Sequence, residues 1–270
     1  MEDLYNDYYQ NSVYGAINGG SDNEFIAQDS PIIGTLAEKT VHKYLKKYYE
    51  PNEQFHEKRI GKFVADIYAN NKIIEVQTGA FNPLKEKLIY YFEKSIPVKV
   101  VCPVAAISTI FWIDKENGEI TSKRKSPIKK DYTAALKQLS SLKLLLANPL
   151  LSIDIVLCEM DEYKSKIQVS RKNRRGHEKV DRTIERVVSV LSLTRKEDYL
   201  YFLPSQIVED SEFFSASDVG EIFKKEKVPV DPWLVCYVLR NCNAIVEIDD
   251  TIKKELNVRK GTKVYKINKK

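Results

Sequence analysis

The residues best suited to chemistry in this sequence are two carboxylates, Asp66 and Glu75, on neighbouring predicted strands. Residues 63–69 alternate apolar and polar side chains, which is the pattern of a half-buried strand. The Asn-Asn dipeptide that follows predicts a two-residue hairpin turn, because Asn adopts positive φ more readily than most residues. A second apolar strand, residues 72–78, would then return along the first.

This predicted hairpin brings the two carboxylates face to face. Pairing outward from the turn joins Ala69 to Lys72 and, three steps further, Asp66 to Glu75. Like charges directly opposite each other destabilise a sheet, so the arrangement calls for a compensating cation. Mg²⁺ is held by one or two carboxylates together with waters and substrate phosphate oxygens. The pair therefore predicts a divalent-metal site that acts on a phosphate substrate, with Gln77 on the same face.

The spacing of these residues resembles a known family of nucleases. Asp66, followed after eight residues by Glu75-Val76-Gln77, resembles the motif of the PD-(D/E)xK, or restriction-endonuclease-like, superfamily. The resemblance implies that Asp66, Glu75 and the Val76 carbonyl bind Mg²⁺ (or Mn²⁺), while a motif lysine helps to activate water. Ala65 stands in place of the motif proline, and Gln77 stands in place of the motif lysine.

The missing lysine has two candidate replacements on the following helix. A neutral amide at Gln77 cannot supply positive charge to an attacking hydroxide, and we expect it to orient water by hydrogen bonding. Some members of the superfamily carry the lysine on the next helix, where Lys85 and Lys87 stand. We favour Lys87, because it lies at the edge of an apolar stripe and would point back toward the sheet.

The predicted helix at residues 35–49 holds a further candidate, Glu38. Nucleases of this family often carry a glutamate in the first helix that reaches the metal, and Glu38 is the natural counterpart. Thr35 and Glu38 also form a capping-box pattern, in which Glu38 would bond the backbone and have no catalytic part. The residues leave these two roles open. His42 is expected to face away from the apolar stripe and to be solvated.

Composition indicates an intracellular protein with a polyanionic partner. The 270 residues carry a net charge of +5, although the first 30 residues contain six acidic residues and no Lys or Arg. The remaining basic surplus favours nucleic acid as partner, or else is an ordinary solvated surface. The four cysteines show no metal-binding spacing and lie in or beside apolar runs, which predicts buried free thiols. With no signal peptide or membrane span in the sequence, we expect a cytoplasmic location.

The order of predicted elements indicates an α/β fold, a restriction-endonuclease-like mixed sheet flanked by helices and followed by a winged-helix domain. After the hairpin the core would contain a helix from residue 83 to 95, strands at 98–102 and 106–113, a helix at 131–147 and a strand at 151–159. The predicted divisions are an acidic, flexible arm (1–29), the nuclease-like domain (30–160), a basic linker and helix (161–196) and the winged-helix domain (197–270). The basic stretch 164–182 would form a hairpin or linker beside the nuclease-like core, and a helix would follow at residues 181–194.

The winged-helix prediction is built on five segments: a helix at 215–225, a turn at 228–230, a recognition helix at 231–243 and wing strands at 244–248 and 263–267. Basic and aromatic side chains there, in a basic loop at 123–127 and in the basic stretch 164–182 are candidates for phosphate or base contacts. The candidates are Arg124, Lys125, Arg174, Arg175, Trp233, Arg240, Arg259 and Lys260.

The sequence therefore predicts a metal-dependent endonuclease that hydrolyses phosphodiester bonds, with DNA as substrate. An alternative is a catalytically inactive nuclease fold that serves as a DNA-binding or assembly protein, since the motif lysine is missing; an RNA nuclease is a third. The combination of a nuclease-like core followed by a winged helix is similar to the endonuclease subunit of heteromeric transposases. Over residues 35–270 the sequence is also similar to a group of uncharacterised bacterial proteins. In the simplest interpretation, Asp66 and Glu75 are solvated residues paired with lysines. A homodimer or a larger complex is left open.

Overall fold

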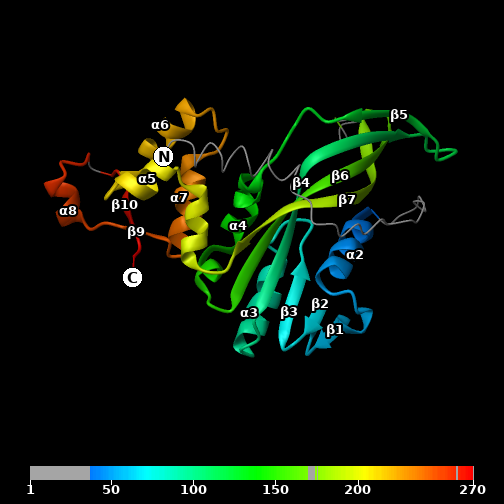
Figure 1. The fold of residues 1–270 in the computed structure, drawn as a ribbon, viewed down its shortest axis with the longest axis horizontal. Coiled ribbons are helices and arrows are strands. Elements are labelled where there is room, and N and C mark those ends of the chain that lie inside the picture. The colour runs from blue at the N-terminus through cyan, green and yellow to red at the C-terminus, as the bar shows by residue number, and fades with distance from the viewer. Residues whose placement is uncertain (1–36, 170–173, 175, 260, 270) are drawn as a thin grey trace.

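The fold is mixed α/β, with one large sheet that carries helices on both faces (Figure 1). The computed structural model describes residues 37–269 apart from 170–173, 175 and 260, with side chains from Thr40 onward. The predicted acidic arm, the Thr35–Glu38 capping box, the side chain of Glu38, and two predicted contact residues, Arg175 and Lys260, lie outside the described residues.

Seven strands form the large sheet, in the order β1-β2-β3-β4-β6-β7 with β5 paired to β4. The β3–β4 and β4–β6 pairs are parallel and the other pairs are antiparallel. A mixed sheet of this kind was predicted, and it is confirmed. The strands are β1 (His56–Ile60), β2 (Phe63–Ala69), β3 (Lys72–Val76), β4 (Val98–Ile113), β5 (Ile120–Lys125), β6 (Leu151–Lys166) and β7 (His177–Leu193).

Helix α2 (Ala37–Tyr49) covers one face of the sheet through Val41 and Leu45, which pack on Val101 and Val156. The other face is covered by α3 (Leu84–Glu93) and by α4 (Leu136–Leu142). Two 3₁₀ helices, η3 (Tyr132–Ala135) and η4 (Lys143–Ala147), flank α4, so the single helix predicted at 131–147 is three helical segments.

Strand β4 is one continuous strand, although Pro103 predicted a break. The N–H of Gln77 donates to the Val101 carbonyl on the β3 side, so the backbone groups of odd-numbered residues there face β3. Because β3 has ended before it reaches Pro103, the missing N–H of this proline removes no hydrogen bond from the ladder. The parallel pairing with β6 runs past Pro103 without interruption.

Strand β7 corrects the predicted helix at 181–194 and the predicted division at 161–196, because residues 177–193 belong to the large sheet; of the two forms predicted for the basic stretch, the hairpin is present and the linker is wrong. It pairs with β6 from Ile153–Leu193 to Lys166–His177, and three register shifts each insert one extra residue into β7. These bulges interrupt the alternation of apolar and polar residues, so the period-two pattern was not visible in the sequence. Many β-branched side chains in the segment favour a strand. The basic stretch is thus largely a long hairpin arm of the sheet.

The basic loop predicted at 123–127 is also partly a strand. Residues Lys123, Arg124 and Lys125 lie in β5, where every side chain is exposed to solvent. This strand pairs with the end of β4.

The C-terminal segment contains the helices predicted at 215–225 and 231–243, the strands predicted at 244–248 and 263–267, and two further α-helices, α5 and α8. Ser215 and Asp231 cap the two main helices through their side-chain oxygens. The small sheet has the order β8-β10-β9. The elements are η5 (Lys196–Phe202), α5 (Ser205–Asp210), β8 (Phe214–Ser215), α6 (Ala216–Lys225), α7 (Pro232–Asn241), β9 (Ile245–Glu247), α8 (Asp250–Glu255) and β10 (Val264–Ile267).

Helix α7 joins this segment to the large sheet. It packs against α4 and η4 as well as α6 and β9, and Val235, Cys236, Val238 and Leu239 are all buried. A single apolar cluster runs from α3 and α4 into α6 and α7. The predicted recognition helix is therefore largely enclosed by the protein itself.

The cysteines agree with the sequence prediction, because all four are free and buried. Burial raises the pKa of each thiol to about 12, so none is an activated nucleophile. Within the part of the chain that the structure describes, no helix has the length and apolar character needed to cross a membrane.

A buried carboxylate, Asp154, ties the C-terminal end of α2 to the sheet. Asp154 is only 2% exposed to solvent. It accepts hydrogen bonds from Lys99 Nζ (2.6 Å), Tyr49 Oη (2.9 Å) and Ser192 Oγ (2.8 Å). These contacts come from β4, α2 and β7, so one carboxylate holds three elements together.

Replacing this carboxylate should therefore destabilise the fold. We expect Asp154→Ala to lower the free energy of unfolding by about 2–4 kcal/mol, since it leaves the Lys99 ammonium without its partner in a poorly solvated place. Ser192→Ala removes one neutral donor and should cost about 1 kcal/mol. Chemical denaturation measures both values, and equal losses in the two variants would contradict this role of the charge.

A pair of carboxylates on β6 and β7 predicts a pH-dependent stability. Burial and a hydrogen bond with Glu185 raise the pKa of Asp161 from 3.8 to about 6. Because the folded protein holds this proton more tightly, the stabilising contribution is present below pH 3.8 and is lost as the pH rises through about 6. The melting temperature of Asp161→Asn minus that of wild type should therefore increase as the pH is raised from 4 to 8. A difference that is constant across this range would refute the coupling.

Candidate active site

The predicted hairpin is present and has the predicted register. Asn70 and Asn71 have φ values of 50° and 56°, as a tight turn with two left-handed residues requires. Ladder pairs join Ala69 to Lys72 and, two steps further, Ile67 to Ile74. This local prediction is confirmed.

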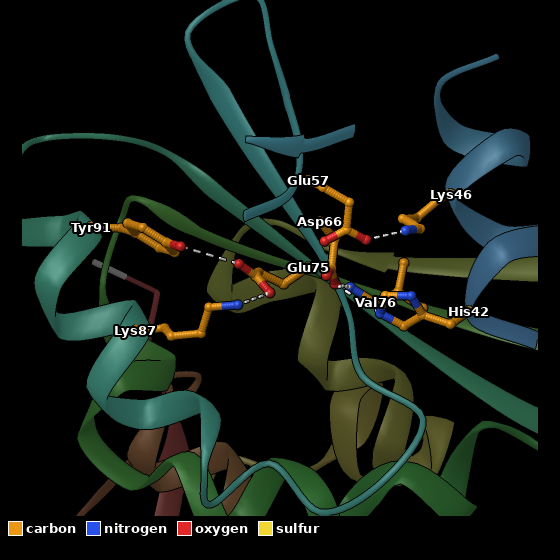
Figure 2. A network of polar contacts seen from close by, with 8 residues as sticks. All are labelled: His42, Lys46, Glu57, Asp66, Glu75, Val76, Lys87 and Tyr91. Atoms are coloured by element: carbon orange, nitrogen blue, oxygen red, sulfur yellow. Dashed lines mark hydrogen bonds and ion pairs between the residues drawn. The ribbon is translucent and has the colours of Figure 1, made fainter. Parts of the chain in front are cut away.

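The ladder ends one step short of the predicted pair of Asp66 and Glu75. Instead of a backbone partner, the N–H of Val76 donates to Asp66 Oδ2 at 2.8 Å. The two strands therefore separate where the carboxylates begin. The carboxylates remain neighbours at the centre of a polar network (Figure 2), but they are not face to face as predicted, because Asp66 is turned toward α2 on one face of the sheet and Glu75 toward α3 on the other.

Asp66 is turned toward α2, where His42 holds it (Figure 2). His42 Nε2 lies 3.0 Å from Asp66 Oδ2. Burial acts to raise the pKa of Asp66, but the hydrogen bond and charge of His42, together with the Val76 amide, hold that pKa below its ordinary value. Asp66 is thus kept ionised, and its hydrogen bond raises the pKa of His42 in turn.

The prediction that His42 is solvated is wrong. The helix carries Val41 and Leu45 on its buried stripe, and His42 follows Val41 directly at the edge of that stripe. From this edge a side chain can reach the sheet. Its place beside an apolar stripe that packs against the acidic hairpin was the signal that could have identified it.

Glu75 is turned toward α3 and is almost completely buried, at 3% exposure. Lys87 Nζ donates to Glu75 Oε2 at 2.7 Å, and Tyr91 Oη donates to Oε1 at 3.4 Å. Burial and the neighbouring charge of Asp66 raise the pKa of Glu75 to about 7, although Lys87 opposes the shift. Lys87 and Tyr91 stand four residues apart on α3, so one face of the helix presents both.

Lys87 is therefore the lysine that α3 directs at the carboxylates, as the sequence favoured over Lys85. Its side chain is 22% exposed, so the ammonium contacts both Glu75 and solvent. An ammonium group that water can reach therefore lies beside the two carboxylates, although Gln77 stands in place of the motif lysine.

A second ion pair borders the site on the α2 side. Lys46 Nζ contacts Glu57 Oε1, and Figure 2 shows both residues beside Asp66 and His42. Glu57 has a φ of 51°, a left-handed conformation that costs free energy in a non-glycine residue. Neither residue was singled out from the sequence, because their proximity depends on how α2 docks on β1.

The predicted metal ligands fit a magnesium ion in number and type. The backbone N–H of Gln77 faces β4, so strand alternation directs the Val76 carbonyl to the side of Asp66. Two carboxylates and a carbonyl satisfy the preference of Mg²⁺ for oxygen, with water completing the shell. No cluster of three or more His, Cys, Asp or Glu side chains suited to a metal occurs among the described residues.

Gln77 has a different contact from the one predicted. Its side-chain Nε2 donates to the Ala80 carbonyl at 2.8 Å, within the connection between β3 and α3. The amide thus fixes the loop that leads into α3, which in turn carries Lys87.

The predicted nucleic-acid contacts are not gathered on one surface. Arg124 and Lys125 lie on β5, and Arg259 follows α8; these elements occupy opposite ends of the molecule in Figure 1. Arg240 is engaged by Tyr237 and, at 3.9 Å, by Glu247. Two others are exposed: Trp233 (56%), at the start of α7, and Arg174, in the β6–β7 connection.

One family matches the chain, over residues 39–194, and is described as Domain of unknown function (DUF8091). The chain belongs to the DUF8091 family. The matched segment runs from α2 to the end of β7, so the DUF8091 domain contains the whole large sheet and every residue of the candidate site. Searches of curated proteins and of solved structures gave no match.

The contact between Asp66 and the Val76 amide gives a prediction that does not depend on activity. In Asp66→Ala, the Val76 N–H should exchange with deuterium about 10- to 100-fold faster, because hydrogen bonds to charged groups contribute about 1.5–3 kcal/mol. Asp66→Asn keeps an acceptor oxygen and should retain most of the protection. NMR-detected exchange, with the Ile74 amide as internal control, measures the effect. Unchanged exchange at Val76 in Asp66→Ala would contradict the geometry.

Proposed function

We propose that this DUF8091 protein is a metal-dependent nuclease that hydrolyses phosphodiester bonds, with DNA as its substrate. The observation that carries the proposal is the pair of adjacent carboxylates, Asp66 and Glu75, with the Lys87 ammonium 2.7 Å from Glu75. Two carboxylates held close together in a poorly solvated place, with a perturbed pKa, are characteristic of functional sites.

The fold supports this proposal through the elements that surround the site. An antiparallel hairpin carries the acids, its second strand continues into a parallel pair with β4, and helices precede and follow the hairpin. This order resembles the restriction-endonuclease-like core. In the C-terminal segment, the order α5-β8-α6-α7-β9-α8-β10 and the sheet order β8-β10-β9 resemble a winged helix with an extra helix, α8, between its last two strands.

Because α7 is enclosed by α4 and η4, we assign this winged-helix-like segment a docking role within the protein. A recognition helix must present polar side chains to a groove. In α7 the strongly exposed large side chain is Trp233, and Arg240 is already engaged with Glu247. Base reading by α7 is therefore not part of the proposal.

In the proposed mechanism each side chain has a distinct task. Asp66 stays ionised because His42 and the Val76 amide stabilise its charge, and Glu75 provides a second oxygen donor. Bound Mg²⁺ or Mn²⁺, held by these two carboxylates and the Val76 carbonyl, would supply Lewis-acid polarisation and a lowered pKa of water. The Lys87 ammonium would orient the attacking water and stabilise negative charge as it develops on the phosphate.

Other residues of the site act as supports. Tyr91 donates to the same carboxylate as Lys87 and limits its rotation. Gln77 holds the loop before α3, and Lys46 keeps Glu57 on the α2 side. Such contacts restrict the reacting groups to one geometry, which lowers the entropic cost of reaction.

Cleavage assays with matched variants test this function. Wild-type protein should nick plasmid DNA or shorten linear DNA with Mg²⁺ or Mn²⁺ and not with EDTA. Asp66→Asn, Glu75→Gln and Lys87→Met should each lose at least about 100-fold in rate. Lys85→Met, which removes a lysine two residues away, should cleave like wild type. If wild type and Asp66→Asn are equally inactive on duplex and single-stranded substrates with either metal, the enzymatic proposal is refuted.

A second candidate function is a nucleic-acid-binding or assembly protein with a nuclease-like fold that does not cut. It is favoured by the contacts of the two carboxylates, since His42 and Lys87 already compensate both charges without a metal. This protein would bind DNA with the same affinity in wild type and Asp66→Asn and would cleave in neither.

A further inference from the structure

Beside the candidate active site lies a surface of two aromatic rings and two lysines, which we call the aromatic platform: Lys62, Phe63, Tyr90 and Lys94. The Phe63 and Tyr90 rings meet edge to face, with centroids 5.3 Å apart. Lys62 Nζ lies 5.0 Å from the Phe63 centroid and 5.8 Å from that of Tyr90, and Lys94 Nζ lies 5.0 Å from the Tyr90 centroid. Both rings are half-buried, and both lysines are exposed.

The aromatic platform adjoins the residues that hold Glu75. Tyr90 lies on α3 and Lys94 caps its C-terminal end one turn later on the same side, while Lys87 and Tyr91 share the neighbouring face. The Tyr91 ring, whose hydroxyl donates to Glu75, lies 6.0 Å from Tyr90 and 6.2 Å from Phe63. A group that contacts the platform would therefore be close to the acidic pair.

A glycine in the β1–β2 turn fixes one ring of the platform. Gly61 has a φ of +61°, and a Cβ placed on it would lie 1.7 Å from Tyr90 Oη. The turn can approach Tyr90 this closely only because residue 61 has no side chain. The ring is thus held between the turn and α3 before any ligand arrives, which reduces the entropy lost on binding.

The basic residues around the rings outnumber the acidic ones, Glu86 and Glu93, and this surplus favours a polyanion. Lys58 and Arg59 on β1 are exposed next to the turn that carries Lys62. Lys62 pairs with Glu86 at 2.7 Å, but their side chains are 59% and 73% exposed, and exposed ion pairs of this kind contribute little. Lys62 can therefore exchange this partner for a phosphate at low cost.

We propose that the aromatic platform binds single-stranded DNA by stacking bases on Phe63 and Tyr90, with Lys62 and Lys94 on the adjacent phosphates. The inference rests on the proposed nuclease function, whose substrate it specifies: the strand to be cut is unpaired at the site. Aromatic side chains bind unpaired bases without sequence preference, whereas a duplex keeps its base faces stacked within the helix.

Binding without cleavage tests the platform. We expect full-length protein in EDTA to bind a fluorescein-labelled 12-residue oligo(dT) more tightly than an abasic strand of the same length and charge, by about 5-fold or more. Phe63→Leu and Tyr90→Leu should each weaken oligo(dT) binding by about 5- to 100-fold and leave abasic binding unchanged. Tyr48→Leu, which replaces a 50% exposed tyrosine on α2, is the matched control and should bind like wild type.

The lysines give an independent readout, since Lys62→Gln and Lys94→Gln should weaken the binding of both strands alike and flatten the dependence of binding on salt.

Equal affinity of wild type for oligo(dT) and the abasic strand would overturn the proposal, and this comparison needs no variant to fold. Oligo(dT) binding that is unaffected in folded Phe63→Leu and Tyr90→Leu would also overturn it. Failure of the proposed function gives a different result: wild type and Asp66→Asn would be equally inactive in cleavage while the preference for oligo(dT) over the abasic strand persists.

Discussion

The structure depends on how one buried carboxylate, Glu75, is compensated beside a second, Asp66. Burial and mutual repulsion work against two negative charges in this place, as the raised pKa of Glu75 reflects. Compensation comes from both sides of the sheet, because α3 supplies Lys87 and α2 supplies His42. The helices that precede and follow the hairpin are thereby fixed to the same strand end. Removing either partner would leave a buried carboxylate without its compensating contact, which costs more than an ordinary surface ion pair is worth.

This arrangement connects the fold to the proposed chemistry. The strands separate where the carboxylates lie, so a backbone amide and a carbonyl of Val76 face Asp66 instead of completing the ladder. On the α3 side the same helix presents Lys87 to the acids and Tyr90 to the neighbouring surface. The C-terminal helices contribute differently, since α7 packs on α4 and extends the apolar core away from the site. Their role is best understood as support for the sheet.

Local signals in the sequence were sufficient for the hairpin and its register, because turn chemistry depends on neighbouring residues alone. The same holds for Lys87, whose direction follows from helical spacing. Strand β7 was missed because three bulges disturb its alternation, and β4 was divided at Pro103 although no hydrogen bond is lost there. The contact of His42 with Asp66 depends on the docking of α2, which no local pattern encodes.

The most direct test of the central claim is a crystal structure of the protein with Mn²⁺, analysed by anomalous scattering. If the two carboxylates form a metal site, an anomalous peak should appear between Asp66 and Glu75, within coordination distance of both and of the Val76 carbonyl. Glu75 should then rotate partly away from Lys87. An absence of anomalous density at millimolar Mn²⁺, with the Glu75–Lys87 pair intact, would contradict the account and leave a fold whose acids are neutralised by the protein alone.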